Sequence, residues 1–162
     1  MRRAADLAPA GGATTFDLVL AQETTRSDDC FLYQKATHRA FYDDTRVGYQ
    51  SGTGCQEVLF ENENGYLTEG SYTTLFVRRN GRLLTPALRH GLLPGTLRAG
   101  FLERGLAVEA DLTKADLGAA NEILVGNSVR GLVRARLMSR GEKRPMPNVD
   151  VGAARRSGIL SV

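Results

Sequence analysis

The spacing of hydrophobic and polar positions changes at about residue 94. Before that point, short apolar runs alternate with the turn dipeptides Asn64-Gly65 and Asn80-Gly81. They predict strands over residues 16–23, 57–61, 66–69, 73–79 and 82–85, of which the last four form an antiparallel meander. Beyond it, the pattern predicts a helix from Pro94-Gly95 to about residue 104, a strand over 107–111, a helix from Thr113 and a buried strand over 123–125. The sequence therefore predicts an α+β domain with a mixed, largely antiparallel sheet.

The two ends of the chain have weaker patterns than the middle. Residues 1–15 predict a loose lead-in, and residues 139–162 predict a basic, weakly ordered tail that is rich in Gly, Pro, Ser and Arg. Residues 16–138 are then the folded domain. No run approaches the roughly 20 apolar residues that cross a bilayer, and the start has no secretory signal. We therefore expect a cytoplasmic protein.

Charge is distributed unevenly around a formal net value of +3. Residues 1–129 hold 13 basic and 16 acidic side chains, hence −3, whereas residues 130–162 hold 8 basic and 2 acidic side chains, hence +6. A basic end could bind nucleic acid, but no aromatic side chain lies among these arginines to stack on a base. A solvated tail is the better interpretation, and we expect neither a nucleic-acid nor a membrane partner.

The few cysteines and histidines do not have the spacing of a metal site. Cys30, Cys55, His38 and His90 form no CxxC or HExxH motif. We expect two free thiols and no bound metal.

Lys35 and Glu69 are candidates for covalent and acid–base chemistry. Lys35 follows the apolar residues 31–33, and a lysine that is shielded from water becomes an amine nucleophile, although a lone lysine more often lies on the surface. Glu69 ends a predicted strand between apolar neighbours, so its carboxylate needs a partner. That partner is either an arginine or a protonated ring nitrogen.

Two further segments offer donors for an anion. Thr96 and Leu97 follow Gly95 at a predicted helix start, where free backbone N–H groups and the helix dipole favour a phosphate, although every helix has such an end. Asn127 and Ser128 follow a buried strand and offer side-chain donors, or form only a turn. A lysine amine, an acid and donors for a dianion are together the groups that pyridoxal phosphate requires.

Several blocks of sequence resemble the class IV pyridoxal-phosphate enzymes, also called fold type IV. The blocks are Glu57–Gly70, Leu84–Leu88 and Gly91–Arg98, and the resemblance extends over roughly residues 31–137. It implies a barrel-like sheet with flanking helices that binds pyridoxal 5'-phosphate.

The resemblance also implies a role for each candidate residue. Lys35 becomes the Schiff-base lysine, and Glu69, which lies 34 positions later (69 − 35), pairs with the pyridine nitrogen. The phosphate lies over Thr96 and Leu97, with help from Asn127 or Ser128. Thr74 occupies the position of the asparagine in the family's Ser-Asn pair, so it offers a hydroxyl in place of an amide.

Within this family, residues 31–39 and 126–132 resemble those of 4-amino-4-deoxychorismate lyases. The resemblance implies a lyase that forms 4-aminobenzoate and pyruvate in folate precursor synthesis. The alternatives are an aminotransferase of D-amino or branched-chain amino acids and a truncated, non-catalytic domain. The non-catalytic alternative arises because the family's N-terminal domain, which supplies an arginine to the phosphate, is not found in this sequence. Arg2 and Arg3 do not replace that arginine. The resemblance further implies a homodimer, fused to or associated with an aminodeoxychorismate synthase component.

Overall fold

The computed structural model describes residues 14–28 and 35–145, with the backbone alone for residues 35–38. Within these ranges the helices are α1 (Lys35–Thr53), α2 (Thr96–Glu103) and α3 (Lys114–Gly118), with one 3-10 turn, η3 (Leu88–His90). The strands are β1 (Phe16–Thr25), β2 (Glu57–Asn62), β3 (Leu67–Gly70), β4 (Thr74–Arg79), β5 (Arg82–Pro86), β6 (Val108–Ala110), β7 (Glu122–Asn127) and β8 (Gly131–Leu137).

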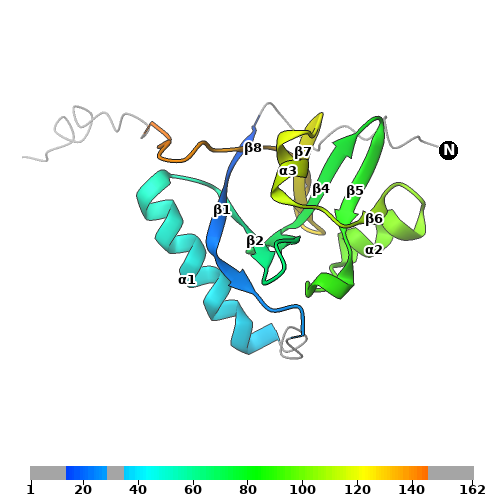
Figure 1. Cartoon of the computed structure of the whole chain (residues 1–162), viewed down its shortest axis with the longest axis horizontal. Helices are drawn as coiled ribbons and strands as arrows, with labels where there is room; N and C mark the ends of the chain where they lie inside the picture. Colours follow the sequence, from blue (N-terminus) through cyan, green and yellow to red (C-terminus); the bar gives the residue numbers. More distant parts are fainter. Residues whose placement is uncertain (1–13, 29–34, 146–162) are drawn as a thin grey trace, which may run out of the picture.

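The strands form one mixed sheet in the order β3-β2-β1-β8-β7-β4-β5-β6. β1 pairs in parallel with β2 and β8, and β5 pairs in parallel with β6, whereas the other four pairings are antiparallel. The sheet curls into a half-barrel, with α1 beside one part of it and α2 beside another (Figure 1). The predicted α+β class and the mixed, largely antiparallel sheet are confirmed.

The predicted antiparallel meander is wrong at the connection between β3 and β4. β3 lies at the edge of the sheet beside β2, whereas β4 pairs with β5 and β7. The chain turns sharply there, because the Gly70 N–H donates to the Thr73 carbonyl at 2.8 Å and the buried Glu57 carboxylate binds residues 71–73. A strand pattern alone does not show this turn.

Two elements differ from the sequence expectation in extent. Lys35 begins a helix of 19 residues that continues to Thr53, a segment for which the predicted elements above include no helix. The helix is attached to the sheet by an aromatic contact, in which the ring of Tyr42 lies edge-on to Phe60 with 4.8 Å between their centroids. β8 is an additional strand that the pattern did not predict, and it pairs with both β1 and β7.

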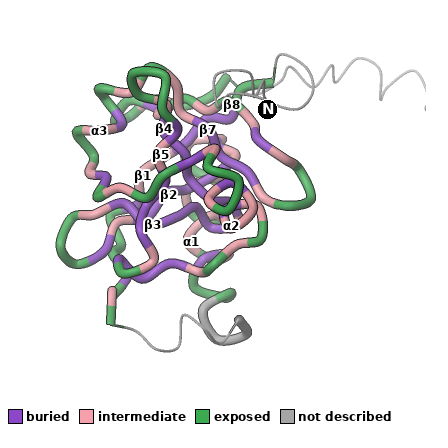
Figure 2. The backbone as a smooth tube through the Cα atoms, turned by 90° about the vertical axis from the view of Figure 1, so that its right-hand side faces the viewer, coloured by how far each residue is buried: buried purple, intermediate pink, exposed green. Residues whose placement is uncertain are grey.

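Buried residues follow the strands, while exposed residues follow the outer loops and the outward sides of the helices (Figure 2). The central cluster includes the fully buried Leu59, Leu75 and Val125. Separate apolar clusters hold α1 against β2 and α2 against β4 and β7. Because each helix has its own attachment, α1 and α2 reach the loop between β3 and β4 from different sides.

Several expectations fall outside the described part of the chain. Residues 1–13, 29–34 and 146–162 lie there, and with them Arg2, Arg3, Cys30 and most of the predicted basic tail. The domain limits at residues 16 and 138 therefore stay a prediction.

Cys55 is a buried free thiol, and burial raises its pKa. None of the helices in the described ranges combines the length and the hydropathy of a membrane span.

Candidate functional site

A cleft with a volume of about 1010 Å³ lies between α1 and the start of α2. Its walls come from α1, from the loop between β3 and β4, from residues 93–97 and from the turn between β7 and β8. All the predicted site residues whose side chains are described line it: Glu69, Thr74, Thr96, Leu97, Asn127 and Ser128. The fold therefore brings together residues that are up to 59 positions apart in the sequence (128 − 69).

Lys35 is the first residue of α1, the helix that contributes one wall of the cleft. Its side chain lies outside the described part of the chain. The role of its amine therefore stays a prediction.

Glu69 is a buried acid that lines the cleft, 9% exposed. Its Oε1 accepts hydrogen bonds from the Tyr42 hydroxyl at 3.2 Å and from the Leu93 N–H at 3.4 Å. Among the described residues, no donor reaches Oε2 and no cation forms an ion pair with this carboxylate. Burial raises the pKa of Glu69 to about 7, and the nearby Glu57 adds to the rise. A cationic N–H group in the cleft would complete the coordination of this acid.

Glu57 is a second buried acid that sequence reasoning missed. It is fully buried, and its Oε1 accepts hydrogen bonds from the Ser71 N–H at 3.0 Å and the Ser71 hydroxyl at 2.5 Å. Its Oε2 accepts from the Tyr72 N–H at 3.2 Å and the Thr73 hydroxyl at 2.7 Å. A Cβ at Gly70 would lie 2.6 Å from this Oε2, so the backbone passes directly over the carboxylate. Glu57 thus fixes the loop that separates Glu69 from Thr74.

The start of α2 presents free backbone donors to the cleft. Gly95 is the N-cap residue and has no side chain to bond the first N–H groups, and the first turn contains no acidic residue. Thr96 and Leu97 both line the cleft at this point. An uncapped helix N-terminus next to a cavity favours an anion, through both its N–H groups and its dipole.

Close packing places the start of α2 against the turn between β7 and β8. A Cβ at Gly126 would lie 2.3 Å from the Gly131 carbonyl oxygen and 3.1 Å from Cδ2 of Leu97. Only glycine therefore lets the three elements approach this closely. The anion donors at Leu97 and Ser128 are brought into one cleft by this approach.

The Asn127 side chain forms hydrogen bonds to the protein backbone. Its Oδ1 accepts from the Val129 N–H at 3.1 Å and the Arg130 N–H at 2.8 Å, and its Nδ2 donates to the Tyr72 carbonyl at 3.2 Å. It therefore ties the turn to the loop that follows Glu69. A phosphate contact by Asn127 or Ser128 stays a prediction. Among the described residues, the exposed Ser128 side chain takes part in fewer hydrogen bonds than that of Asn127.

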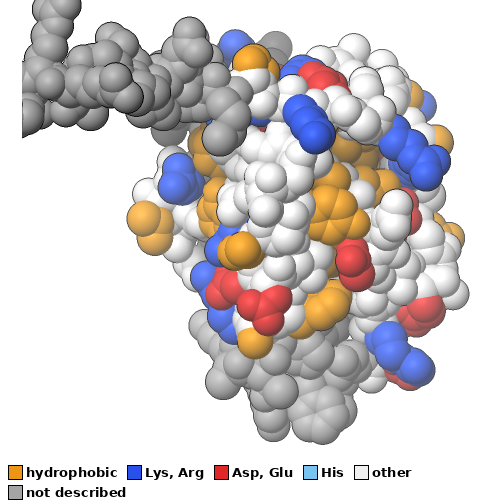
Figure 3. Space-filling view, turned by 90° about the vertical axis from the view of Figure 1, so that its left-hand side faces the viewer, with side chains coloured by type: hydrophobic (Ala, Val, Ile, Leu, Met, Phe, Trp, Pro, Cys, Tyr) orange, Lys and Arg blue, Asp and Glu red, His pale blue; other side chains and the backbone are white. Residues whose placement is uncertain are grey.

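A stripe of α1 side chains, which the sequence did not predict, completes the cleft: Arg39, Tyr42, Arg46 and Gln50. These positions are three or four residues apart, which is the spacing of one helix face. The stripe could have been found if the whole of α1 had been identified as helix. On the side of the molecule that carries α1, basic and acidic side chains are interspersed with exposed apolar ones (Figure 3).

The sequence matches a known family over most of its length. The model for "Amino-transferase class IV" matches residues 5–138. A protein of Schizosaccharomyces pombe, provisionally assigned as an aminodeoxychorismate lyase, is 34% identical over 124 aligned positions, in an alignment that covers 74% of this chain and 53% of the relative. The aminodeoxychorismate lyase of Saccharomyces cerevisiae is 33% identical over 136 aligned positions, in an alignment that covers 74% of this chain and 36% of the relative. The chain thus spans about half, or less, of the length of these relatives.

A solved structure has the same fold. The crystal structure of a Mesorhizobium loti protein, provisionally assigned as an amino-acid aminotransferase, superposes with a TM-score of 0.73 at 38% identity. The superposition covers 81% of this chain and 63% of that one.

Proposed function

This chain belongs to the class IV aminotransferase family, and from that membership we propose that it binds pyridoxal 5'-phosphate through Lys35 and acts as a lyase on 4-amino-4-deoxychorismate. The products would be 4-aminobenzoate and pyruvate. Two relatives that are more than 30% identical carry the lyase name, which supports this choice of reaction. The observation that carries the proposal is the half-satisfied Glu69 carboxylate in the same cleft as the uncapped start of α2.

The donors and acceptors of the cleft fit the cofactor. Glu69 has an oxygen without a described donor, as a protonated pyridine nitrogen requires. The N–H groups of Thr96 and Leu97, with the Ser128 hydroxyl, suit a phosphate. Thr74 lines the cleft beside Glu69 and offers a hydroxyl.

Lys35 and Glu69 would divide the chemistry between them. When bound, pyridoxal phosphate supplies a reactive aldehyde and a ring that withdraws electrons from the substrate carbon next to the amine. Lys35 would form the covalent link to the cofactor and, once displaced by the substrate amine, act as a general base at that carbon. Glu69 would keep the proton on the ring nitrogen.

An aminotransferase that acts on D-amino or branched-chain amino acids is the second candidate. It is favoured by the 38% identity to the Mesorhizobium loti protein that is provisionally assigned as an amino-acid aminotransferase. It would use the same lysine and acid but would need a keto acid as a second substrate. The requirement for a keto acid therefore separates the two reactions.

Reductive trapping tests the proposal. Borohydride treatment of the protein with pyridoxal phosphate, followed by peptide mass spectrometry, is expected to place the adduct on Lys35, and Lys35→Ala should lose it. Lys114→Ala changes an exposed lysine outside the cleft and should retain it. An adduct on another amine would overturn the proposal.

Product analysis distinguishes the candidate reactions. Pyruvate release from 4-amino-4-deoxychorismate without added keto acid supports the lyase, whereas a strict need for a keto acid supports the aminotransferase. An adduct on Lys35 without turnover would favour a non-catalytic domain. Light scattering, alone and with an aminodeoxychorismate synthase component, tests the homodimer and the association that we also propose.

A further inference from the structure

The anion donors at the start of α2 lack a full positive charge. Backbone N–H groups and a serine hydroxyl are neutral donors, whereas a phosphate monoester carries between about one and a half and two negative charges near neutral pH. Building on the proposed function, we propose that Arg46 supplies the missing charge and binds the phosphate of the ligand in this cleft. Nothing in the motifs described above assigns a role to this residue.

Arg46 is held firmly at the wall of the cleft. Its side chain is 20% exposed, its Nη1 donates to the Ser71 hydroxyl at 2.9 Å, and its Nη2 lies 3.0 Å from Oδ1 of Asp43. Its Cζ also lies 4.9 Å from the centroid of the Tyr72 ring. A guanidinium that is already ordered loses little conformational freedom when it binds a ligand, which favours a specific site over a mobile surface charge.

The wall that holds Arg46 is joined to the proposed phosphate donors. Arg46 lies over the Tyr72 ring, and the carbonyl of the same tyrosine accepts a hydrogen bond from Asn127 Nδ2. Ser128 follows Asn127 directly, and it lines the cleft together with Arg46. Arg46 is therefore connected through one residue to the turn that offers the hydroxyl donor.

A cluster of charged side chains on the α1 wall of the cleft has one excess positive charge. Arg39 and Arg46 are the cationic residues among the described side chains that line it. Asp43 pairs with both, at 3.4 Å and 3.0 Å, and does not itself line the cleft. The two guanidiniums and this carboxylate together carry a net +1 on the α1 wall, while Glu69 is the acid that lines the cleft from β3. Arg39 is 60% exposed, so the less exposed Arg46 is the better placed of the two.

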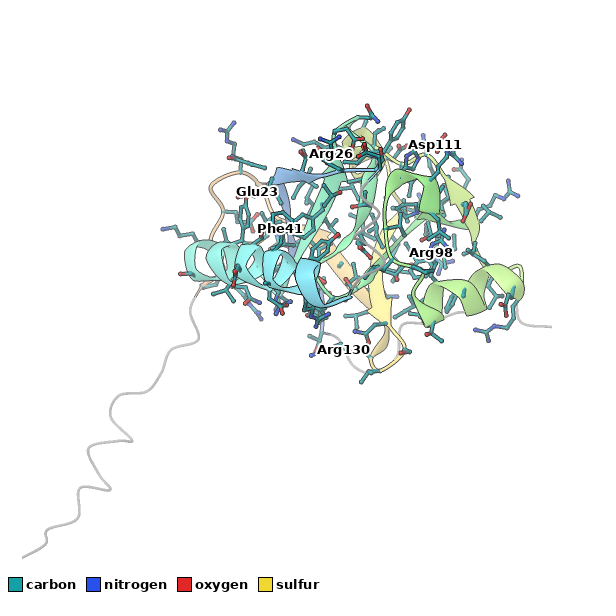
Figure 4. The ribbon with its side chains drawn as sticks, turned by 90° about the horizontal axis from the view of Figure 1, so that it is seen from below. Glu23, Arg26, Phe41, Arg98, Asp111 and Arg130 are labelled. Atoms are coloured by element: carbon teal, nitrogen blue, oxygen red, sulfur yellow. The ribbon has the colours of Figure 1, made fainter. Side chains whose placement is uncertain are left out.

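Arg130 provides a matched control. Its Cζ lies 5.9 Å from the Tyr72 ring centroid and 5.5 Å from that of Phe16, so it contacts the same tyrosine as Arg46. It does not line the cleft, and it lies at the turn between β7 and β8 (Figure 4). Replacing Arg130 removes the same charge from the protein without removing a cation from the cavity.

Calorimetric titrations of the full chain test the proposal, with inorganic phosphate, pyridoxal phosphate and pyridoxal as ligands. Arg46→Met is expected to weaken binding of inorganic phosphate and pyridoxal phosphate by about tenfold or more, the usual effect of losing a charge-assisted contact. Binding of pyridoxal, which has no phosphate, should stay within about twofold. Arg46→Lys should lose less than Arg46→Met, because it keeps the charge, and Arg130→Met should match the wild-type chain.

The comparison with pyridoxal separates lost charge from lost structure. Damage to the loop would weaken pyridoxal and pyridoxal phosphate equally, and that result would overturn the proposal. It would also be overturned if Arg46→Met bound inorganic phosphate as tightly as the wild-type chain, or if the wild-type chain bound none. Failure of the trapping experiment at Lys35 would not decide this question, because inorganic phosphate binds without a lysine adduct.

Discussion

The hydroxyl of Tyr42 donates a hydrogen bond of 3.2 Å to Oε1 of Glu69. Tyr42 lies in α1, the helix that begins at Lys35, and Glu69 lies in β3. The Leu93 N–H reaches the same oxygen at 3.4 Å from the segment before α2. Three walls of the cleft thus meet at one carboxylate oxygen, which leaves the second oxygen for a ligand.

Glu69→Gln should make stability less dependent on pH. Burial raises the pKa of Glu69 from 4.5 to about 7, so the folded protein holds this proton more tightly than the unfolded chain. The stabilising contribution is full below the unfolded pKa and is lost as the pH rises through the folded value, a difference of roughly 3 kcal/mol. Urea unfolding between about pH 5 and pH 8, which covers this titration, measures the difference in stability. Parallel profiles for the two proteins would contradict the expectation.

Tyr42→Phe should lower stability by about 1 kcal/mol and move the Glu69 titration to higher pH. The hydroxyl bonds the carboxylate and so favours its ionised form, which means that its loss raises the pKa further. The same unfolding series measures both effects. Tyr49→Phe is the control, because Tyr49 bonds Glu23 and does not line this cleft. If Tyr49→Phe moved the titration as far as Tyr42→Phe does, the assignment to the Tyr42 bond would be wrong.

Glu57→Gln should destabilise the protein by about 3 kcal/mol, because a buried amide N–H₂ would face donors where an oxygen now accepts. Three consecutive residues, 71–73, depend on this carboxylate. Hydrogen exchange of the Ser71 and Tyr72 amides should accelerate. Glu103→Gln, on the exposed side of α2, should change neither quantity. Unaltered exchange in Glu57→Gln would show that the loop of residues 71–73 is stable without this carboxylate.

Local signals were sufficient for the strands and for several residues of the cleft. Asn64-Gly65 and Asn80-Gly81 define tight turns by their own backbone preferences, and both Gly65 and Gly81 have positive φ. The strands on either side were therefore predicted to within one or two residues. The family motifs led to Glu69, Thr96 and Leu97 for the same reason, since each lies inside a contiguous block.

Features that depend on distant contacts could not be predicted. Glu57 acts on residues 14 to 16 positions later, and only the turn in space makes it an acceptor. α1 continues to Thr53 through Gly48 and Gly52, two poor helix formers, because packing against β2 stabilises it. An acid at the start of β2, directly before its apolar run, was the one available signal for Glu57.

Gly126→Ala should lower stability by about 2 kcal/mol and weaken phosphate binding, because the new methyl group would overlap the Gly131 carbonyl and press on Leu97. The strain can be relieved only by moving β8 or the start of α2, and either movement separates the donors of the anion site. Gly52→Ala is the matched control: it adds the same methyl group in open space on a helix, so stability should stay equal or rise by up to about 1 kcal/mol. Thermal unfolding and phosphate titration measure the two effects. If Gly126→Ala were as stable as Gly52→Ala and bound phosphate equally well, close approach of the three elements would not be what forms the site.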